Sequence, residues 1–369
     1  MLICKVTTLG SAPIQRLLCT MARSISLDRF KGCLVGGVAG DCLGAPFEGD
    51  QTVSSTVLNS YLEHMDEAAQ KRNQPYKPYT DDTAMTFALC KSLLKNEGLN
   101  LIDLAGQYAH EFLSDPRRGY GSGAQHVLAA IATEKLYEST DESAVLEPAR
   151  QQFGGQGSYG NGAAMRVSPV ALLHAKDPIE LMITTAHRQS LITHSNGLAV
   201  LGAVIQAAAV RIALQTEEGK EIDPKRFVNE LRNVIIKVDH VDASHREIYL
   251  EKLNLVLRFL GKTAIDEEEF CEQLGNDISA PGSVPTAVYA FLKALKPSQD
   301  FEVGSGILRT ILTAIEFGGD TDTIASMAAS IAGAYYGRAD IGEDVLKHCE
   351  GVQLAEQYAE GFFARLTQQ

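Results

Sequence analysis

Apolar residues recur at helical spacing, at every third or fourth position, along almost the whole chain from Leu27 onward. Alternation of apolar and polar positions, which marks strands, is nowhere sustained. The pattern predicts helices over residues 27–45, 58–71, 84–94, 101–113, 124–132, 167–174, 179–189, 197–214, 227–237, 248–260, 267–274, 284–295, 306–316, 324–336 and 352–367. We therefore expect one all-α domain, a compact orthogonal packing of helices, over residues 27–369.

The first predicted helix carries a stripe of glycines. Gly32, Gly36, Gly40 and Gly44 recur every four residues, so they share one face of the helix. Each glycine costs about 1 kcal/mol of helix propensity relative to alanine. The stripe therefore predicts a central helix against which another backbone packs closely, and the helix rich in small residues at 324–336 is a suitable partner. The central helix should end near Pro46 and leave Glu48 on a loop.

The composition excludes some classes of protein. The 369 residues carry a formal net charge of −13, which argues against broad non-specific nucleic-acid binding, because such binding needs a basic surface. We expect no apolar run as long as a membrane span, because the longest candidate, residues 34–47, is interrupted by Asp41. Seven scattered cysteines without a C-x-x-C pair are typical of a reducing compartment.

Residues 1–26 differ from the rest of the chain. They contain Lys5, Arg16 and Arg23 and no acidic residue. A basic, hydroxyl-rich leader of this kind is typical of a mitochondrial transit peptide. A flexible tail, or translation that begins at Met21, would account for the same composition, and the sequence leaves these alternatives open.

Two acidic clusters each precede an apolar helix. One is Thr80-Asp81-Asp82-Thr83 and the other is Gly318-Gly319-Asp320-Thr321-Asp322-Thr323. Asp and Thr are common helix caps, but a cap needs one oxygen and each cluster offers several. Adjacent carboxylates also repel each other unless a cation offsets their charge. Dense oxygen ligands suit Mg²⁺ or Mn²⁺, so the clusters predict a shared binuclear metal cleft.

The second candidate element is the glycine-rich segment 153–166. It lacks the lysine of a phosphate-binding P-loop. Its backbone N–H groups, from Gln156 to Gly162, could still bind a diphosphate, and Phe153 and Tyr159 could enclose a purine. A tight connection without a ligand would also be rich in glycine. Similarly, His194 before a helix start could bind ligand phosphate or ribose, or serve only the local fold.

Glu48 is the remaining acid of interest. A mobile carboxylate beside a binuclear metal site could activate water or protonate a leaving group, although a loop glutamate commonly has no such role. No G-x-S-x-G motif occurs, and no cysteine lies in an electropositive context. Covalent catalysis by serine or cysteine is therefore disfavoured.

Together these motifs resemble the ADP-ribosylhydrolase family. The resemblance is carried by Gly40-Asp41-Cys42-Leu43-Gly44 with Glu48 and by residues 79–85, 157–166 and 318–323, and it extends over about 27–365. It implies an all-α fold with two Mg²⁺ ions. Within the family, the chain is most similar to the vertebrate hydrolases of ADP-ribosyl-serine.

The resemblance also implies roles for individual residues. Proton transfer would fall to Glu48 or Asp320. The metal ligands would be Glu48, Thr80, Asp81, Asp82, Asp320, Asp322 and Thr323. The substrate would contact Asp81, Gly119, Phe153, Gln156, Gly157, Ser158, Tyr159, Gly160, Asn161, Gly162, His194 and Ile278.

The implied activity is Mg²⁺-dependent cleavage of the O-glycosidic bond of ADP-ribosyl-serine. Poly(ADP-ribose) and O-acetyl-ADP-ribose would be further substrates, and ADP-ribose the product. We expect a monomer that reverses ADP-ribosylation in the DNA damage response, in nucleus, cytoplasm and, through the leader, mitochondrial matrix. Alternatives are arginine-linked hydrolysis, disfavoured by the 157–162 loop and Glu48, and a non-catalytic ADP-ribose-binding relative, which would usually have lost metal ligands.

Overall fold

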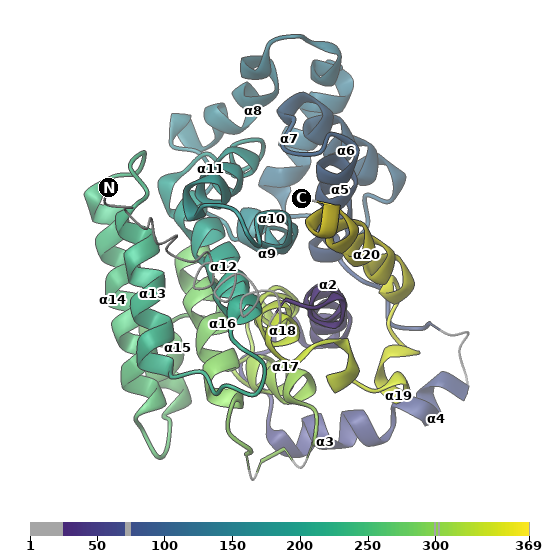
Figure 1. Ribbon diagram of the computed structural model, residues 1–369, viewed down its shortest axis with the longest axis vertical. Helices are drawn as coiled ribbons and strands as arrows, with labels where there is room; N and C mark the ends of the chain where they lie inside the picture. Colours follow the sequence, from purple (N-terminus) through teal and green to yellow (C-terminus); the bar gives the residue numbers. More distant parts are fainter. Residues whose placement is uncertain (1–24, 71–74, 299, 302, 369) are drawn as a thin grey trace, which may run out of the picture.

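The computed structural model describes residues 25–70, 75–298, 300–301 and 303–368. Every regular element in this part of the chain is a helix, and the helices pack into one body (Figure 1). Extended pairing among the described residues is limited to two isolated bridges, Lys77 with Cys349 and Gly160 with Ser279. The all-α prediction is confirmed.

The helices follow one another with short connections. In chain order they are α2 (Leu27–Gly44), η1 (Ala45–Phe47), α3 (Ser55–Glu63), α4 (Met65–Gln70), α5 (Asp81–Lys95), α6 (Leu101–Ser114), α7 (Ser122–Thr133), η2 (Leu136–Glu138), α8 (Glu142–Gly155), α9 (Gly162–Met165), α10 (Ser168–Leu173), α11 (Ile179–Ser190), α12 (Gly197–Gln215), α13 (Pro224–Ile236), α14 (Ala243–Leu260), α15 (Glu267–Gln273), α16 (Ala280–Ala294), α17 (Gly306–Glu316), α18 (Thr321–Tyr336), η3 (Arg338–Asp340), α19 (Glu343–Leu346) and α20 (Val352–Gln368).

Most helix positions agree with the sequence pattern, and the exceptions have local causes. Helix α8 was not predicted, because Pro148 and a polar composition obscure its period. The single helix expected over 58–71 is divided into α3 and α4. Helix α16 begins at Ala280, earlier than expected, because Ser279 caps it and prolines are accommodated within it.

The glycine stripe of α2 packs against α18 at the centre of the molecule (Figure 1). A Cβ at Gly32, Gly36, Gly40 or Gly44 would lie 2.3, 2.4, 2.3 or 2.5 Å from the backbone oxygen of Gly333, Ala329, Ala325 or Thr321, respectively. These distances are too short for any side chain, so the close approach requires glycine. The pairs run in opposite directions along the two helices. The end of α2, and Glu48 after it, therefore lies beside the start of α18.

Helix α12 corrects one expectation from the sequence. It is long and apolar enough to cross a membrane, so the prediction that no such run exists is wrong. In the structure, 78% of its apolar window is buried inside the molecule. It packs against α9, α11, α13, α16 and α18, which is the position of a core helix, and the core accommodates its polar Gln206 through a hydrogen bond to the Met327 carbonyl.

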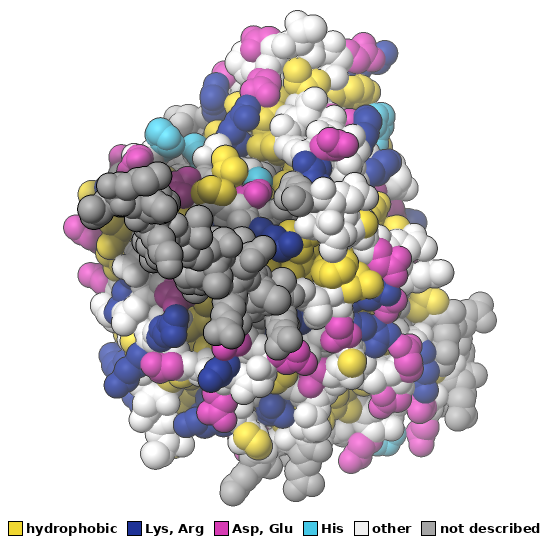
Figure 2. Space-filling view, in the orientation of Figure 1, with side chains coloured by type: hydrophobic (Ala, Val, Ile, Leu, Met, Phe, Trp, Pro, Cys, Tyr) yellow, Lys and Arg dark blue, Asp and Glu magenta, His cyan; other side chains and the backbone are white. Residues whose placement is uncertain are grey.

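The surface is mixed in charge on the face shown in Figure 2, where basic and acidic side chains alternate without a large basic area. This distribution agrees with the net charge of −13. A hollow of about 910 Å³ lies between α12 and α13, lined by Arg211, Gln215 and Phe227 among others. None of its lining residues belongs to the predicted site, so the carboxylate clusters, not this hollow, locate the candidate site.

Candidate metal and nucleotide site

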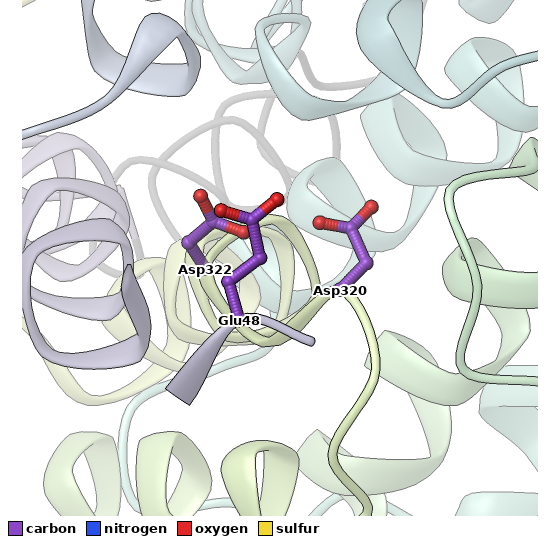
Figure 3. A group of neighbouring side chains, drawn as sticks. All are labelled: Glu48, Asp320 and Asp322. Atoms are coloured by element: carbon purple, nitrogen blue, oxygen red, sulfur yellow. The ribbon is translucent and has the colours of Figure 1, made fainter. Parts of the chain in front are cut away.

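Three predicted carboxylates converge at the start of α18. Ligand oxygens of Glu48, Asp320 and Asp322 all lie within 4.8 Å of one another, and Figure 3 shows the three side chains pointing to the same side. Asp320 and Asp322 are buried, whereas Glu48 is exposed. The cluster therefore combines two fixed acids with one that is open to solvent.

Backbone hydrogen bonds hold the Glu48 loop against the glycine turn before α18. The Gly49 N–H donates to the Gly319 carbonyl at 2.9 Å, and the Gly319 N–H donates to the Asp50 carbonyl at 2.7 Å. Gly318 and Gly319 have φ angles of 65° and 73°. A Cβ at either position would lie 2.0 Å from a backbone oxygen. Both glycines are therefore required for this turn.

The acidic cluster at Thr80-Asp81-Asp82-Thr83 lies at the start of α5 and contacts the cluster at the start of α18. Thr80 caps α5 by accepting a hydrogen bond from the Asp82 N–H at 3.4 Å. The Thr323 hydroxyl donates to Asp82 Oδ2 at 3.1 Å, which joins the two clusters. Asp82 Oδ1 is buried and has no hydrogen-bond partner among the described residues. The cluster therefore caps α5, which was the alternative to metal binding. The cap still leaves the Asp82 Oδ1 oxygen as a buried acceptor, which a cation would satisfy.

Asp41 belongs to this site and was not predicted as a functional residue. It lies fully buried on α2, and its carboxylate accepts hydrogen bonds from the Thr80 N–H, the Thr83 N–H and, at 2.5 Å, the Thr83 hydroxyl. Burial and then the charge of Asp322 raise the pKa of Asp41 to about 7. The feature of the sequence that could have indicated Asp41 is its position as an acidic residue among the glycines and apolar residues of a helix predicted to be central.

The electrostatics of the clusters favour a cation. Burial, followed by the charges of Asp322 and Asp41, raises the pKa of Asp81 to about 8. The same causes hold the pKa of Asp82 well above its usual range. Burial also raises the pKa values of Asp320 and Asp322. Carboxylates that are too costly to ionise together, with an unpartnered acceptor among them, fit a divalent metal ion.

Gly119, a predicted substrate contact, lies beside Asp81. The Asp81 N–H donates to the Arg118 carbonyl at 2.7 Å. Gly119 has a φ of 92°, and a Cβ there would lie 3.5 Å from Asp81 Oδ1. Arg118 is itself fixed by two hydrogen bonds to the Glu350 carboxylate, at 2.6 and 2.9 Å. The Arg118–Glu350 pair therefore positions one side of the carboxylate cluster.

The glycine-rich loop uses several of its N–H groups internally. The Gly157 N–H donates to the Gln152 carbonyl at 3.0 Å, the Gly160 N–H to Ser158 Oγ at 3.2 Å, and the Asn161 N–H to the Ile278 carbonyl at 3.0 Å. Gln156 donates at 3.4 Å to Phe153. Within the described residues, the N–H groups of Ser158, Tyr159 and Gly162 have no partner. Of the N–H groups predicted to bind a diphosphate, only these three are therefore available to do so within the described residues.

Three large apolar side chains stand exposed around this loop. Phe153, Tyr159 and Ile278 are 63%, 54% and 72% exposed. Phe153 also has a φ of 51°, which is unusual for a bulky residue and indicates a backbone held by its surroundings. Asn161 joins the loop to the metal cluster, because its side-chain amide donates to Asp320 Oδ2 at 2.5 Å.

His194 is buried beneath the loop. A Cβ at Gly162 would lie 2.6 Å from the His194 ring, so the loop packs directly on the imidazole. Burial, and then the positive charge of Arg166, lower the pKa of His194 to about 3. The ring is therefore neutral at physiological pH. It can support the loop and donate one hydrogen bond, but it supplies no positive charge to a phosphate.

Comparisons with known proteins identify the family. The sequence profile of the ADP-ribosylglycohydrolase family matches residues 22–369, and the chain belongs to that family of glycohydrolases. The resemblance seen in the motifs is thereby confirmed.

Individual members of the family show how similar the chain is to known proteins. The ADP-ribosylhydrolase ARH3 of Xenopus tropicalis is 39% identical over 92% of this chain and 95% of its own length. The human ADP-ribosylhydrolase ARH3 is 37% identical over 89% of this chain and 91% of its own length. A solved structure titled ADP-ribosylglycohydrolase-related protein complex covers 92% of this chain and 98% of its own, with a TM-score of 0.63 and 20% identity, and supports the fold alone.

Proposed function

We propose that this protein hydrolyses the O-glycosidic bond that joins ADP-ribose to serine in modified proteins, with poly(ADP-ribose) and O-acetyl-ADP-ribose as further substrates. The Asn161–Asp320 hydrogen bond of 2.5 Å carries the proposal. It joins the exposed aromatic loop to the acidic cluster, so a ligand whose adenine lies at the loop could extend its distal ribose toward the carboxylates. The similarity to proteins named ADP-ribosylhydrolase ARH3 supports the same activity.

Two Mg²⁺ ions, or Mn²⁺ in their place, are the proposed cofactors. Their ligands would be Glu48, Thr80, Asp81, Asp82, Asp320, Asp322 and Thr323. Bound metal would supply positive charge that polarises an oxygen ligand such as water or a ribose hydroxyl. The unpartnered Asp82 Oδ1 and the raised pKa values of the surrounding acids support this assignment.

The protein's own groups would act on the bond between the anomeric carbon and the serine oxygen. Cleavage of such bonds passes through an oxocarbenium-like state. A serine alkoxide is a poor leaving group, so a proton must reach the departing oxygen. Glu48 and Asp320 are the two candidates for handling protons. Glu48 is exposed on its loop, and Asp320 is buried and held by Asn161.

The nucleotide end of the ligand would occupy the glycine-rich loop. The free N–H groups of Ser158, Tyr159 and Gly162 would bind the diphosphate. Phe153 and Tyr159 would stack on the adenine, since their rings are already exposed and the backbone fixes their positions. The remaining contacts would come from Asp81, Gly119, Gln156, Gly157, Gly160, Asn161, His194 and Ile278.

Residues 1–26, most of which lie outside the described part of the chain, bear on localisation. We propose that the protein acts as a monomer in nucleus and cytoplasm, and that this leader directs a fraction to mitochondria. Its basic, acid-free composition supports targeting. Imaging of a C-terminally tagged chain with and without residues 1–26 tests the point, and identical mitochondrial signal in both would exclude a targeting role.

The deciding experiment measures ADP-ribose release from a serine-modified and an arginine-modified peptide, each with Mg²⁺ and with EDTA. We expect Mg²⁺-dependent release from the serine peptide alone. A Glu48→Ala variant should keep ADP-ribose binding and lose most turnover. Release from the arginine peptide would instead favour the arginine-linked activity. Binding of ADP-ribose with no release from either peptide would indicate a non-catalytic relative.

A further inference from the structure

The loop between α15 and α16 contacts both halves of the site. We call residues 275–280 the strap. On one side, the Asn276 carbonyl accepts a hydrogen bond from the Asp320 N–H at 2.8 Å. The Asn276 side-chain amide donates to the Phe317 carbonyl, also at 2.8 Å. Asn276 thus holds both ends of the glycine turn that carries Asp320.

The other side of the strap holds the glycine-rich loop. The Ile278 carbonyl accepts the Asn161 N–H at 3.0 Å, and the Ala280 N–H donates to the Tyr159 carbonyl at 3.0 Å. These bonds form the isolated bridge of Gly160 with Ser279. The backbone that presents Tyr159 is therefore set by the strap.

The strap is fixed to the body of the protein between these contacts. The buried Thr286 hydroxyl of α16 donates to the Gly275 carbonyl at 2.6 Å. Ser279 caps α16 by accepting the Gly282 N–H at 3.1 Å. Gly275 has a φ of 99°, and a Cβ there would lie 2.6 Å from Gly282 Cα. A shift on one side of the strap must therefore be transmitted to the other side or strain these contacts.

Side chains close the same network. The Asn161 amide donates to Asp320 Oδ2 at 2.5 Å and to Ser283 Oγ at 3.1 Å. Ser283 Oγ in turn donates to the Ser279 carbonyl at 2.9 Å. The turn at Asp320, the strap and the loop at Asn161 thus form a closed ring of hydrogen bonds.

We infer that Asn276 is a positioning residue that couples the carboxylate cluster to the nucleotide loop. The inference rests on the proposed function, since it assumes a metal ion at the cluster and an adenine nucleotide at the loop. The same strap sets the backbone of both, so an arrangement that favours one ligand favours the other. Such coupling is reciprocal between the two binding events.

The test uses two probes that separate the halves. Mg²⁺ alone is titrated into the ligand-free protein, and ADP alone is titrated into the protein in EDTA. ADP lacks the distal ribose, and no metal is present in the second titration, so ADP has no direct route to the carboxylates. Asn276→Leu keeps the branched shape of the side chain but removes its bond to Phe317, and Asn276→Ala removes both the bond and the branched group.

Both variants should weaken Mg²⁺ binding, because Asn276 contacts the turn of Asp320. The diagnostic result is that they also weaken ADP binding in EDTA, by roughly fivefold or more, which is the lower range of typical site-to-site coupling. Among the described residues, the Asn276 side chain donates to Phe317 and makes no hydrogen bond to the loop, so this second loss must be transmitted by the strap.

Asn100→Ala provides the matched control. Asn100 caps α6 by accepting the Asp103 N–H at 3.0 Å, and neither residue belongs to the strap or to the loop. Its loss should lower the melting temperature but leave both dissociation constants unchanged. Weaker Mg²⁺ binding with unchanged ADP binding in both Asn276 variants would overturn the coupling and leave the proposed function intact. A wild-type protein that does not bind ADP would overturn the proposed function, and the coupling with it.

Discussion

The two halves of the site are built by different means. The carboxylate half consists of Glu48 and the acids that begin α5 and α18, and it is held by the packing of long buried helices. The nucleotide half, residues 153–162, lies on the surface and is held by backbone hydrogen bonds to the strap and to Gln152. One half is assembled from several segments far apart in the chain, and the other is a single continuous segment that the distant strap holds in place.

The difference shows where each half stores unfavourable energy. In the carboxylate half it is electrostatic, because burial and mutual repulsion raise the pKa values of Asp81 and Asp82. In the nucleotide half it is conformational, since Phe153, a bulky residue, has a φ of 51°. Substitutions should therefore affect the halves separately, except where the strap joins them.

The largest effect is expected from Asp81→Asn combined with Asp320→Asn. Both changes remove charge from the carboxylate half, so Mg²⁺ should no longer raise the melting temperature and turnover should be lost. The metal-free variant should be more stable than metal-free wild type, because buried repulsion is relieved. Thermal unfolding with Mg²⁺ and with EDTA measures both effects.

The same variant also tests the separation of the halves. ADP binding in EDTA should persist, since Phe153, Tyr159 and the loop backbone are unchanged. Undiminished stabilisation by Mg²⁺ would remove the metal site from these residues.

Gly44→Ala should damage the carboxylate half through packing alone. The new Cβ would lie 2.5 Å from the Thr321 carbonyl oxygen and 2.7 Å from Asp322 Cα. We expect a loss of about 1–3 kcal/mol of unfolding free energy, typical of overpacking, and weaker Mg²⁺ binding. Gly304→Ala is the control, because a Cβ there meets no atom of the described part of the chain within 4 Å. Urea unfolding of the two variants makes the comparison, and equal stability would contradict the role given to the glycine stripe.

The sequence predicted the carboxylate half in unusual detail. The stripe of Gly32 to Gly44 and the paired Asp-Thr clusters are local patterns, and the spacing of four places the glycines on one helix face. What the pattern could not give was the direction of the partner helix, which decides that Gly44 meets Thr321. Asp41 was missed for a related reason. Its place in the site depends on a contact with Thr83, and no residue near it in sequence indicates that contact.

The sequence predicted which segment forms the nucleotide half but not how its backbone N–H groups are arranged. Glycine-rich composition indicates a loop, yet which of its N–H groups remain free depends on Ile278, which lies more than a hundred positions further along the chain. Nothing in the sequence around Asn276 indicated a role for this residue. A single asparagine in a loop is ordinary, and only the tertiary contacts with Phe317 and Asp320 give it a role.

Tyr159→Ala should weaken the nucleotide half without affecting the other. The exposed ring has no structural partner to lose, and the backbone bond from Ala280 to residue 159 does not depend on the side chain. Loss of base stacking should cost about 1–3 kcal/mol of ADP-ribose binding, with Mg²⁺ binding unchanged. Calorimetric titration measures this, with Ile236→Ala as an exposed apolar control on α13. Unaltered affinity for ADP-ribose would place the adenine elsewhere.

The smallest effect should come from His194→Gln, and it should depend on pH. Burial holds the pKa of His194 at about 3 in the folded protein, below its ordinary value of 6.5. As the pH falls below 6.5, the unfolded chain binds a proton that the folded chain does not, so wild type loses stability on acidification. The limiting slope is about 1.4 kcal/mol per pH unit.

Glutamine cannot titrate, so the His194→Gln variant should lack this component of the pH dependence. Urea unfolding in EDTA between pH 5 and 8 would then show a difference between wild type and variant that is constant above about pH 7 and shifts toward the variant at lower pH. All other titrating groups are common to both proteins and cancel in the difference. Parallel curves down to pH 5 would mean that the folded protein protonates His194, and the nucleotide half would then offer a phosphate a cation instead of a neutral ring.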